Sequence, residues 1–88
     1  MQNEFLWEKE SRKKYVLMIA KIPLFHREIA RQVVDKKAVE NARERGAQQV
    51  EEGDIVRAFL SEVPKAFYSL MVRLFEEVGL DYRRYEPK

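Results

Sequence analysis

Apolar residues follow a helical period in four segments of the chain. They recur every three to four positions over residues 4–20, 24–45, 51–62 and 65–78, and this spacing is typical of amphipathic α-helices. The last segment has the most regular stripe, which consists of Phe67, Leu70, Met71, Leu74, Phe75 and Val78. The pattern predicts an all-α fold: a compact four-helix single domain.

Prolines and glycines mark where the predicted helices begin and end. Asn3 is the predicted N-cap of the first helix. Pro23 separates the first helix from the second, because a proline disfavours helical geometry in the residue before it. Gly46 suits the left-handed position just past the second helix, and Pro64 and Gly79 end the third and the fourth.

The same periodicity predicts which side chains are buried. On the first helix they are Trp7, Ser11, Tyr15, Met18 and Ile22. On the second helix they are Phe25, Ile29, Val33, Val34, Ala38 and Ala42. We expect Val50 to lie under the core ahead of the third helix. The apolar face of the fourth helix must dock on the other three or on a partner, and docking within the domain is the favoured interpretation.

Composition limits the functions open to the chain. Its 88 residues fit one domain, expected at residues 1–80 with a tail at 81–88. The absence of cysteine excludes disulfides and thiolate-bound metals. The longest apolar run, residues 15–20, is far shorter than the ~20 residues of a membrane span, and the polar start is unlike a signal peptide. We therefore expect a cytoplasmic protein without a membrane span.

No pattern in the sequence indicates catalysis. His26 is the only histidine, and the nearest carboxylate along its helix, Glu28, is at the wrong spacing to bind the same metal ion. We therefore interpret His26 as a surface or boundary residue. The three glycines are far apart, which excludes a glycine-rich phosphate loop. Ser11, Ser61 and Ser69 have no base motif around them. We expect no catalytic residue, no cofactor and no metal ligand.

A series of motifs resembles one known family. In order along the chain they are Trp7-Glu8-Lys9-Glu10, Lys21-Ile22-Pro23 with Phe25 and Arg27, Ala42-Arg43-Glu44-Arg45-Gly46, Val50, and Asp54-Ile55 with Ala58. This order resembles the small proto-chlorophyllide reductase (PCP reductase) domain at the C-terminus of the B subunit of light-independent protochlorophyllide reductase. The likeness covers residues 7–59. The nitrogenase-like catalytic body of that subunit has no counterpart in the chain, and the helix at 65–78 is an addition.

The resemblance implies a non-catalytic accessory or binding module in a tetrapyrrole-reducing, nitrogenase-like system of chlorophyll biosynthesis. The implied partners are a protein, such as a nitrogenase-like reductase subunit, and a tetrapyrrole, and a homodimer is a further possibility. The candidate partner-facing residues are Trp7, Arg27, Arg31 and Arg43.

A second resemblance leads to an alternative function. Residues 38–59 are similar to the end of the long middle helix and the last helix of archaeal-type histones, which implies a dimeric DNA-binding protein. Ala47-Gln48-Gln49 stand where those histones carry the Arg-Lys-Thr set that fixes the loop on DNA. The net charge is +2, and residues 1–46 carry a surplus of positive charge. The alternative nucleic-acid contacts are Arg12, Lys13, Lys14, Lys36, Lys37, Arg83 and Arg84.

Overall fold

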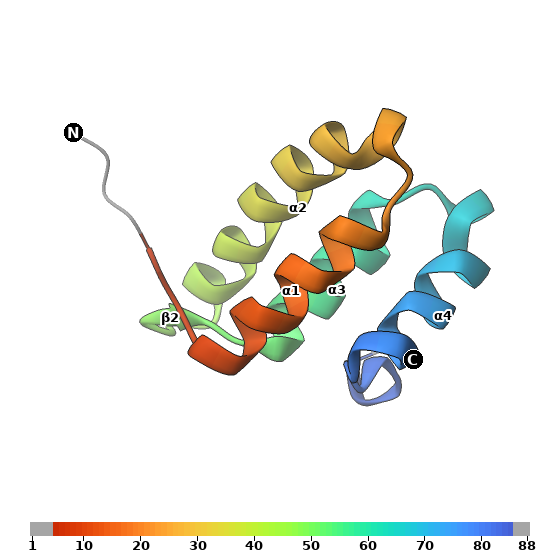
Figure 1. The fold of residues 1–88 in the computed structure, drawn as a ribbon. Coiled ribbons are helices and arrows are strands. Elements are labelled where there is room, and N and C mark those ends of the chain that lie inside the picture. The colour runs from red at the N-terminus through yellow and green to blue at the C-terminus, as the bar shows by residue number, and fades with distance from the viewer. Residues whose placement is uncertain (1–4, 86–88) are drawn as a thin grey trace.

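The computed structural model describes residues 5–85 (Figure 1). In chain order its elements are β1 (Leu6–Trp7), α1 (Lys9–Lys21), α2 (Leu24–Glu44), β2 (Gln49–Val50), α3 (Glu52–Glu62), the 3-10 segment η1 (Lys65–Phe67), α4 (Tyr68–Val78) and the 3-10 segment η2 (Tyr82–Tyr85). The all-α, four-helix prediction is confirmed.

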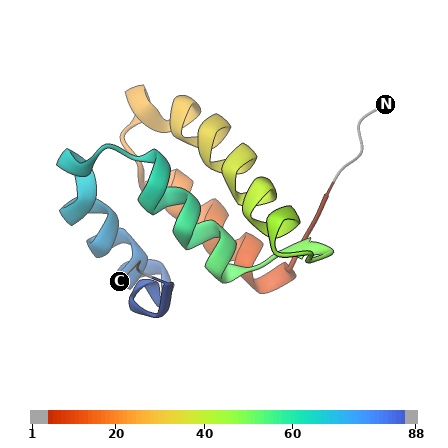
Figure 2. The ribbon, with the colours of Figure 1, turned by 180° about the vertical axis from the view of Figure 1, so that it is seen from behind.

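The helices pack in a bundle with α1 and α3 at its centre (Figures 1 and 2). Seen from either side, α2 flanks this central pair on one side and α4 flanks it on the other. The two short strands lie at one end of the bundle, and the connection from α1 to α2 lies at the opposite end. Among residues 5–85, no helix has the length and apolar character that crossing a membrane requires.

The first helix begins later than the sequence predicts. Leu6 and Trp7 are extended and pair in parallel with Gln49 and Val50, so this part of the chain is held as a strand and not as a helix. Helix α1 starts at Lys9, and its N-cap is Glu8. The predicted cap, Asn3, lies outside the described residues.

Glu8 caps α1 through its side chain. Its carboxylate accepts hydrogen bonds from Ser11 Oγ at 2.7 Å, from the Ser11 backbone N–H at 2.8 Å and from the Glu10 backbone N–H at 3.0 Å. These bonds, led by that from the Ser11 hydroxyl, lower the pKa of Glu8. The cap explains why Ser11 is buried on the face that the sequence predicts for the core.

Other helix ends agree with the sequence to within one residue, except at the start of α4. Helix α2 runs from Leu24, directly after Pro23, to Glu44. Gly46 and Gly79 both take positive φ angles, as expected of glycines that end helices. The predicted helix at 65–78 begins with a 3-10 turn, in which the Phe67 N–H bonds the Pro64 carbonyl, and becomes α-helical at Tyr68.

A row of aromatic side chains runs through the core and joins five elements. We define this aromatic row as Trp7, Tyr15, Phe59, Phe75 and Tyr82. Neighbouring ring centroids along it are 5.1, 5.9, 5.7 and 5.7 Å apart, within the range of favourable aromatic pairs. Because Tyr82 is buried and Leu80 beside it is buried too, η2 packs back on the domain.

The predicted core stripe of α2 is only half correct. Val34, Ala38 and Ala42 are fully buried, whereas Phe25 is 91% exposed and Ile29 and Val33 also face solvent. The reason is length: α2 has 21 residues and spans about 32 Å, whereas α3 has 11 and spans about 17 Å. Since α3 follows α2 after a short connection, it covers only the C-terminal half of the longer helix.

Tyr15 ties α1 to α2. Its hydroxyl donates a short hydrogen bond to Asp35 Oδ1 and lies 3.3 Å from the backbone oxygen of Arg31. Burial of the ring, followed by the bond to Asp35, raises the pKa of Tyr15 far above its ordinary value of 10.0. The phenol is therefore held in its neutral form in the folded protein.

This raised pKa predicts a pH-dependent stability. Because the folded state binds the Tyr15 proton more tightly than the unfolded state does, its contribution is complete below pH 10.0 and is lost as the pH rises above that value. Urea unfolding of the wild type and of Tyr15→Phe at stepwise pH tests this. We expect the wild type to be more stable by about 1 kcal/mol near neutrality, with a difference that shrinks in alkali. A difference that stays constant would contradict the linkage.

Candidate functional site

An apolar groove of about 200 Å³ opens at the end of the bundle where α1 joins α2 and α3 turns into α4. One wall comes from the start of α2 and the residues before it: Ile22, Pro23, His26, Ile29, Ala30 and Val33. The other wall comes from the end of α3 and from η1 and α4: Glu62, Val63, Pro64, Phe67, Leu70 and Met71. Glu62 and His26 are the only residues of this lining with ionisable side chains.

Two prolines shape the groove. Pro23 and Pro64 each turn the chain between two helices, so the ends of four helices meet here. The ring of His26 lies 5.9 Å from the ring of Phe67, which joins the two walls. His26 is exposed and lines the groove, which fits the surface position among those expected from the sequence.

The exposed part of α2 extends the apolar surface beyond the groove. Phe25, Ile29 and Val33, which we call the α2 stripe, are spaced four residues apart and so lie along one side of the helix. Ile29 and Val33 also line the groove. Phe25 leaves in solvent most of the roughly 150–250 Å² that an aromatic side chain can bury. A continuous apolar surface of this kind marks an interaction site more often than an isolated exposed residue does.

Arg27, one of the candidate partner-facing residues, is occupied within the chain. Its Nη2 donates to the carbonyl oxygens of Ala20 at 2.9 Å and Ile22 at 3.1 Å, and its Nε donates to Ile22 at 3.2 Å. These acceptors belong to the end of α1, where carbonyls lack helical partners. Arg27 therefore holds the α1–α2 connection that forms one wall of the groove.

Of the other three partner-facing candidates, Trp7 and Arg43 lie at the strand end of the bundle, and Arg31 lies further back along α2. Arg31 pairs with Glu28 at 2.6 Å and with Asp35 at 3.5 Å. Trp7 is half-buried against Tyr15, and Arg43 lies over the ring of Phe5. Since 16 residues of one helix separate Arg27 from Arg43, about 24 Å lies between their backbones. The structure does not bring the four residues together.

The cations proposed for DNA are also dispersed. Lys13 and Lys14 pair with Glu10 and Glu52, each at 3.5 Å. Arg12 lies over the Trp7 ring and Arg83 over the Tyr82 ring. Lys36 is exposed on α2. Only Lys37 and Arg84 meet, at a hollow between α2, α3 and η2.

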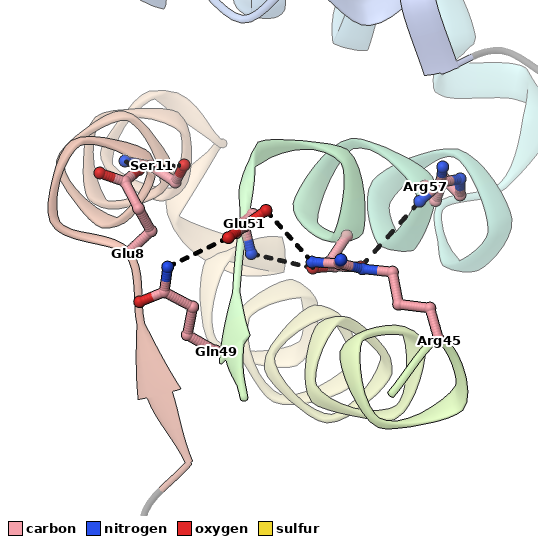
Figure 3. Close-up of polar contacts among 7 residues, drawn as sticks. Glu8, Ser11, Arg45, Gln49, Glu51 and Arg57 are labelled. Atoms are coloured by element: carbon pink, nitrogen blue, oxygen red, sulfur yellow. Dashed lines mark hydrogen bonds and ion pairs between the residues drawn. The ribbon is translucent and has the colours of Figure 1, made fainter. Parts of the chain in front are cut away.

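A buried ion pair closes the connection from α2 to α3. Asp54 is 0% exposed, and its carboxylate accepts hydrogen bonds from Arg45 Nε at 2.8 Å, Arg45 Nη2 at 2.7 Å and the Glu51 N–H at 2.9 Å. Figure 3 shows the Arg45 side chain reaching from the end of α2 towards Glu51 at the start of α3. The bonds to Asp54 raise the pKa of the Arg45 guanidinium. We call Arg45 and Asp54 the lock, because this ion pair joins the end of α2 to the start of α3.

Sequence reasoning missed both the groove and the lock. The groove residues Ile29 and Val33 were expected in the core, and Arg45 was named only as part of a family motif. One signal was present: Asp54 follows Glu51 by three residues, which is the spacing of a capping box at the start of a helix. Within the described part of the chain, no group of three or more His, Cys, Asp or Glu side chains is arranged to hold a metal ion.

Comparison with known proteins identifies the family. Residues 1–88 match the family described as "Protein of unknown function (DUF2621)". The chain belongs to the DUF2621 family. No curated protein and no solved structure matches the sequence. The description of DUF2621 names no activity, ligand or partner, so the two resemblances stay predictions for this DUF2621 chain.

Proposed function

We propose that this DUF2621 chain is a non-catalytic binding module that docks an apolar helix of a partner protein in the groove and along the α2 stripe. The observation that carries the proposal is the groove itself, with apolar walls and Phe25 exposed beside it. Amphipathic helices bind other proteins in this way, by placing anchors one turn apart into an apolar groove.

The motif behind the first resemblance supports this function. Its central part, residues 21–27, forms one end of the groove: Ile22 and Pro23 line it, Phe25 stands beside it, and Arg27 fixes the backbone of the turn. A nitrogenase-like reductase subunit is therefore the partner that we propose to test first.

The size of the groove favours a protein over a pigment. Sites that enclose a small molecule usually measure about 300–1,000 Å³, and this groove measures about 200 Å³. A tetrapyrrole is a large, flat ring system and would remain mostly outside. Side chains of a partner helix, such as leucine or phenylalanine, match the available volume.

The test is a binding titration followed by NMR amide shifts. The labelled chain is mixed with purified subunits of a light-independent protochlorophyllide reductase, and in parallel with a protochlorophyllide analogue. We expect saturable shifts at Phe25, Ile29 and Phe67 with a protein subunit. Replacing Phe25 and Ile29 by glutamate should weaken binding tenfold or more, because a buried aromatic anchor contributes about 2 kcal/mol or more.

Leu6→Glu is the matched control. Leu6 is 67% exposed and Ile29 is 64% exposed, but Leu6 lies in β1 at the other end of the bundle (Figure 1). Since all these side chains face solvent, each variant should unfold within about 0.5 kcal/mol of the wild type. Binding that is lost equally in Leu6→Glu would refute the proposal. So would sedimentation of the wild type as a dimer and of Phe25→Glu as a monomer, since a second copy would then cover the stripe.

A further inference from the structure

A second concave surface, separate from the groove, gathers positive charge. It is a hollow of about 430 Å³ between α2, α3 and η2. Its wall carries Lys37, Arg57 and Arg84 together with Asn41, Ser61 and Tyr85. We call it the basic hollow. No carboxylate among residues 5–85 lines it.

The cations of the basic hollow are only loosely neutralised by their neighbours. Lys37 Nζ is 3.9 Å from the nearest oxygen of Glu40, and Arg57 Nη1 is 4.0 Å from Asp54, distances too long for hydrogen bonds. The Asp54 carboxylate instead accepts its hydrogen bonds from Arg45 and from the Glu51 N–H. Arg57 and Lys37 therefore keep donors for a ligand.

Arg57 and Arg84 both lie close to the ring of Tyr85. The guanidinium carbons of Arg57 and Arg84 each lie 5.6 Å from the centre of this ring, so they are at most twice that distance apart. At such separations the two like charges repel weakly, and an anion that contacts both offsets this repulsion. Arginine pairs with phosphate oxygens in a bidentate way, and lysine adds a point charge.

Gly53 makes room for this arrangement. A Cβ atom at position 53 would lie 2.8 Å from Tyr85 Cε1 and 2.9 Å from Tyr85 Cδ1, closer than real side chains approach. A glycine in the first turn weakens helix α3, so its presence needs a reason. Here the missing side chain lets Tyr85 dock on α3, which holds Arg84 in the wall of the hollow.

We propose that the basic hollow binds the phosphate group of a small phosphorylated molecule through Lys37, Arg57 and Arg84. The volume of the hollow lies in the range typical of small-molecule sites and exceeds the size of one phosphate, so the ligand carries a further group. Two of these cations belong to the set predicted to contact DNA, but Arg57 does not. Because the remaining cations of that set lie elsewhere, a small ligand fits better than a duplex.

The experiment measures binding of inorganic pyrophosphate to the whole chain by NMR amide shifts, at constant ionic strength adjusted with chloride. We expect saturable shifts at Lys37, Arg57 and Arg84. Replacing Arg57 or Arg84 by glutamine should weaken binding about tenfold, since each removes charged hydrogen bonds to the anion. Arg73→Gln and Lys13→Gln remove the same charge outside the hollow and should leave the dissociation constant within about twofold.

Gly53→Ala separates a built site from simple charge attraction. It retains every cation but displaces Tyr85, so it should weaken pyrophosphate binding about as much as Arg84→Gln does. Equal binding by Gly53→Ala and the wild type overturns the proposal, as does equal weakening by Arg73→Gln. A parallel titration with duplex DNA completes the test: shifts that occur with DNA alone and extend to Arg12 and Lys13 overturn it too.

Discussion

Replacing Arg45 by alanine should destabilise the protein by about 3–5 kcal/mol, because it leaves the buried Asp54 carboxylate without its bidentate partner. The remaining hydrogen-bond donor, the Glu51 N–H, and the charge of Arg57 at 4.0 Å replace only part of what is lost. The free energy of unfolding of a small domain is about 5–15 kcal/mol, so this substitution removes a large part of the stability. Urea unfolding followed by circular dichroism gives the value.

The two side chains of the pair differ in their exposure to solvent, and this difference predicts which substitution costs more. Arg45 is 40% exposed on its side chain and can return to water, whereas Asp54 cannot. Asp54→Asn should therefore cost less than Arg45→Ala, and adding Asp54→Asn to Arg45→Ala should recover part of the loss. Arg43→Ala, two residues earlier and exposed, is the control. If Arg45→Ala costs no more than Arg43→Ala, the lock does not stabilise the fold.

The helices of this fold can be predicted from local sequence signals, and the reason is physical. Pro23 fixes its own backbone φ angle, and Gly46 and Gly79 can adopt the positive φ angles that end helices, so the ends that they set depend little on the rest of the chain. The apolar period then gives the faces. Both signals are contained within a few residues of the feature that they predict.

Features that depend on distant segments could not be predicted in the same way. The extended backbone of Leu6 and Trp7 needs β2 as its partner, more than 40 residues away. The exposure of Phe25 depends on where α3 stops alongside α2, which no local pattern records. The groove results from this mismatch in length between two packed helices. The most apolar part of the candidate site, the groove with the exposed stripe of α2, is therefore the part that the sequence predicted least well.

Some partners of the basic residues also depend on distant segments, so the sequence did not predict them. The sequence suggested dispersed basic residues along α1, α2 and the tail, and the structure pairs two of them, Lys13 and Lys14, with carboxylates. Arg57 was not singled out, although it lies between the lock and the basic hollow. Its role depends on Tyr85 docking over Gly53, a contact between α3 and η2.

The second large effect is expected at the centre of the aromatic row. Phe59 is fully buried and contacts Tyr15 on α1 and Phe75 on α4. Phe59→Ala should cost about 3–5 kcal/mol, because it removes this apolar contact and leaves a cavity. Phe25→Ala is the same chemical change at a side chain that is 91% exposed, and it should cost less than about 0.5 kcal/mol.

Trp7, the only tryptophan, reports on the whole row because it packs against Tyr15 at one end. If the row is one cooperative unit, urea transitions of Phe59→Ala measured by Trp7 fluorescence and by helical circular dichroism should coincide at a lower midpoint. A fluorescence midpoint equal to that of the wild type would show that α1 and β1 are stable without the row. Val63, which directly follows α3, and Met71 of α4 line the groove. Phe59→Ala should therefore also weaken partner binding, whereas Phe25→Ala should weaken binding without loss of stability.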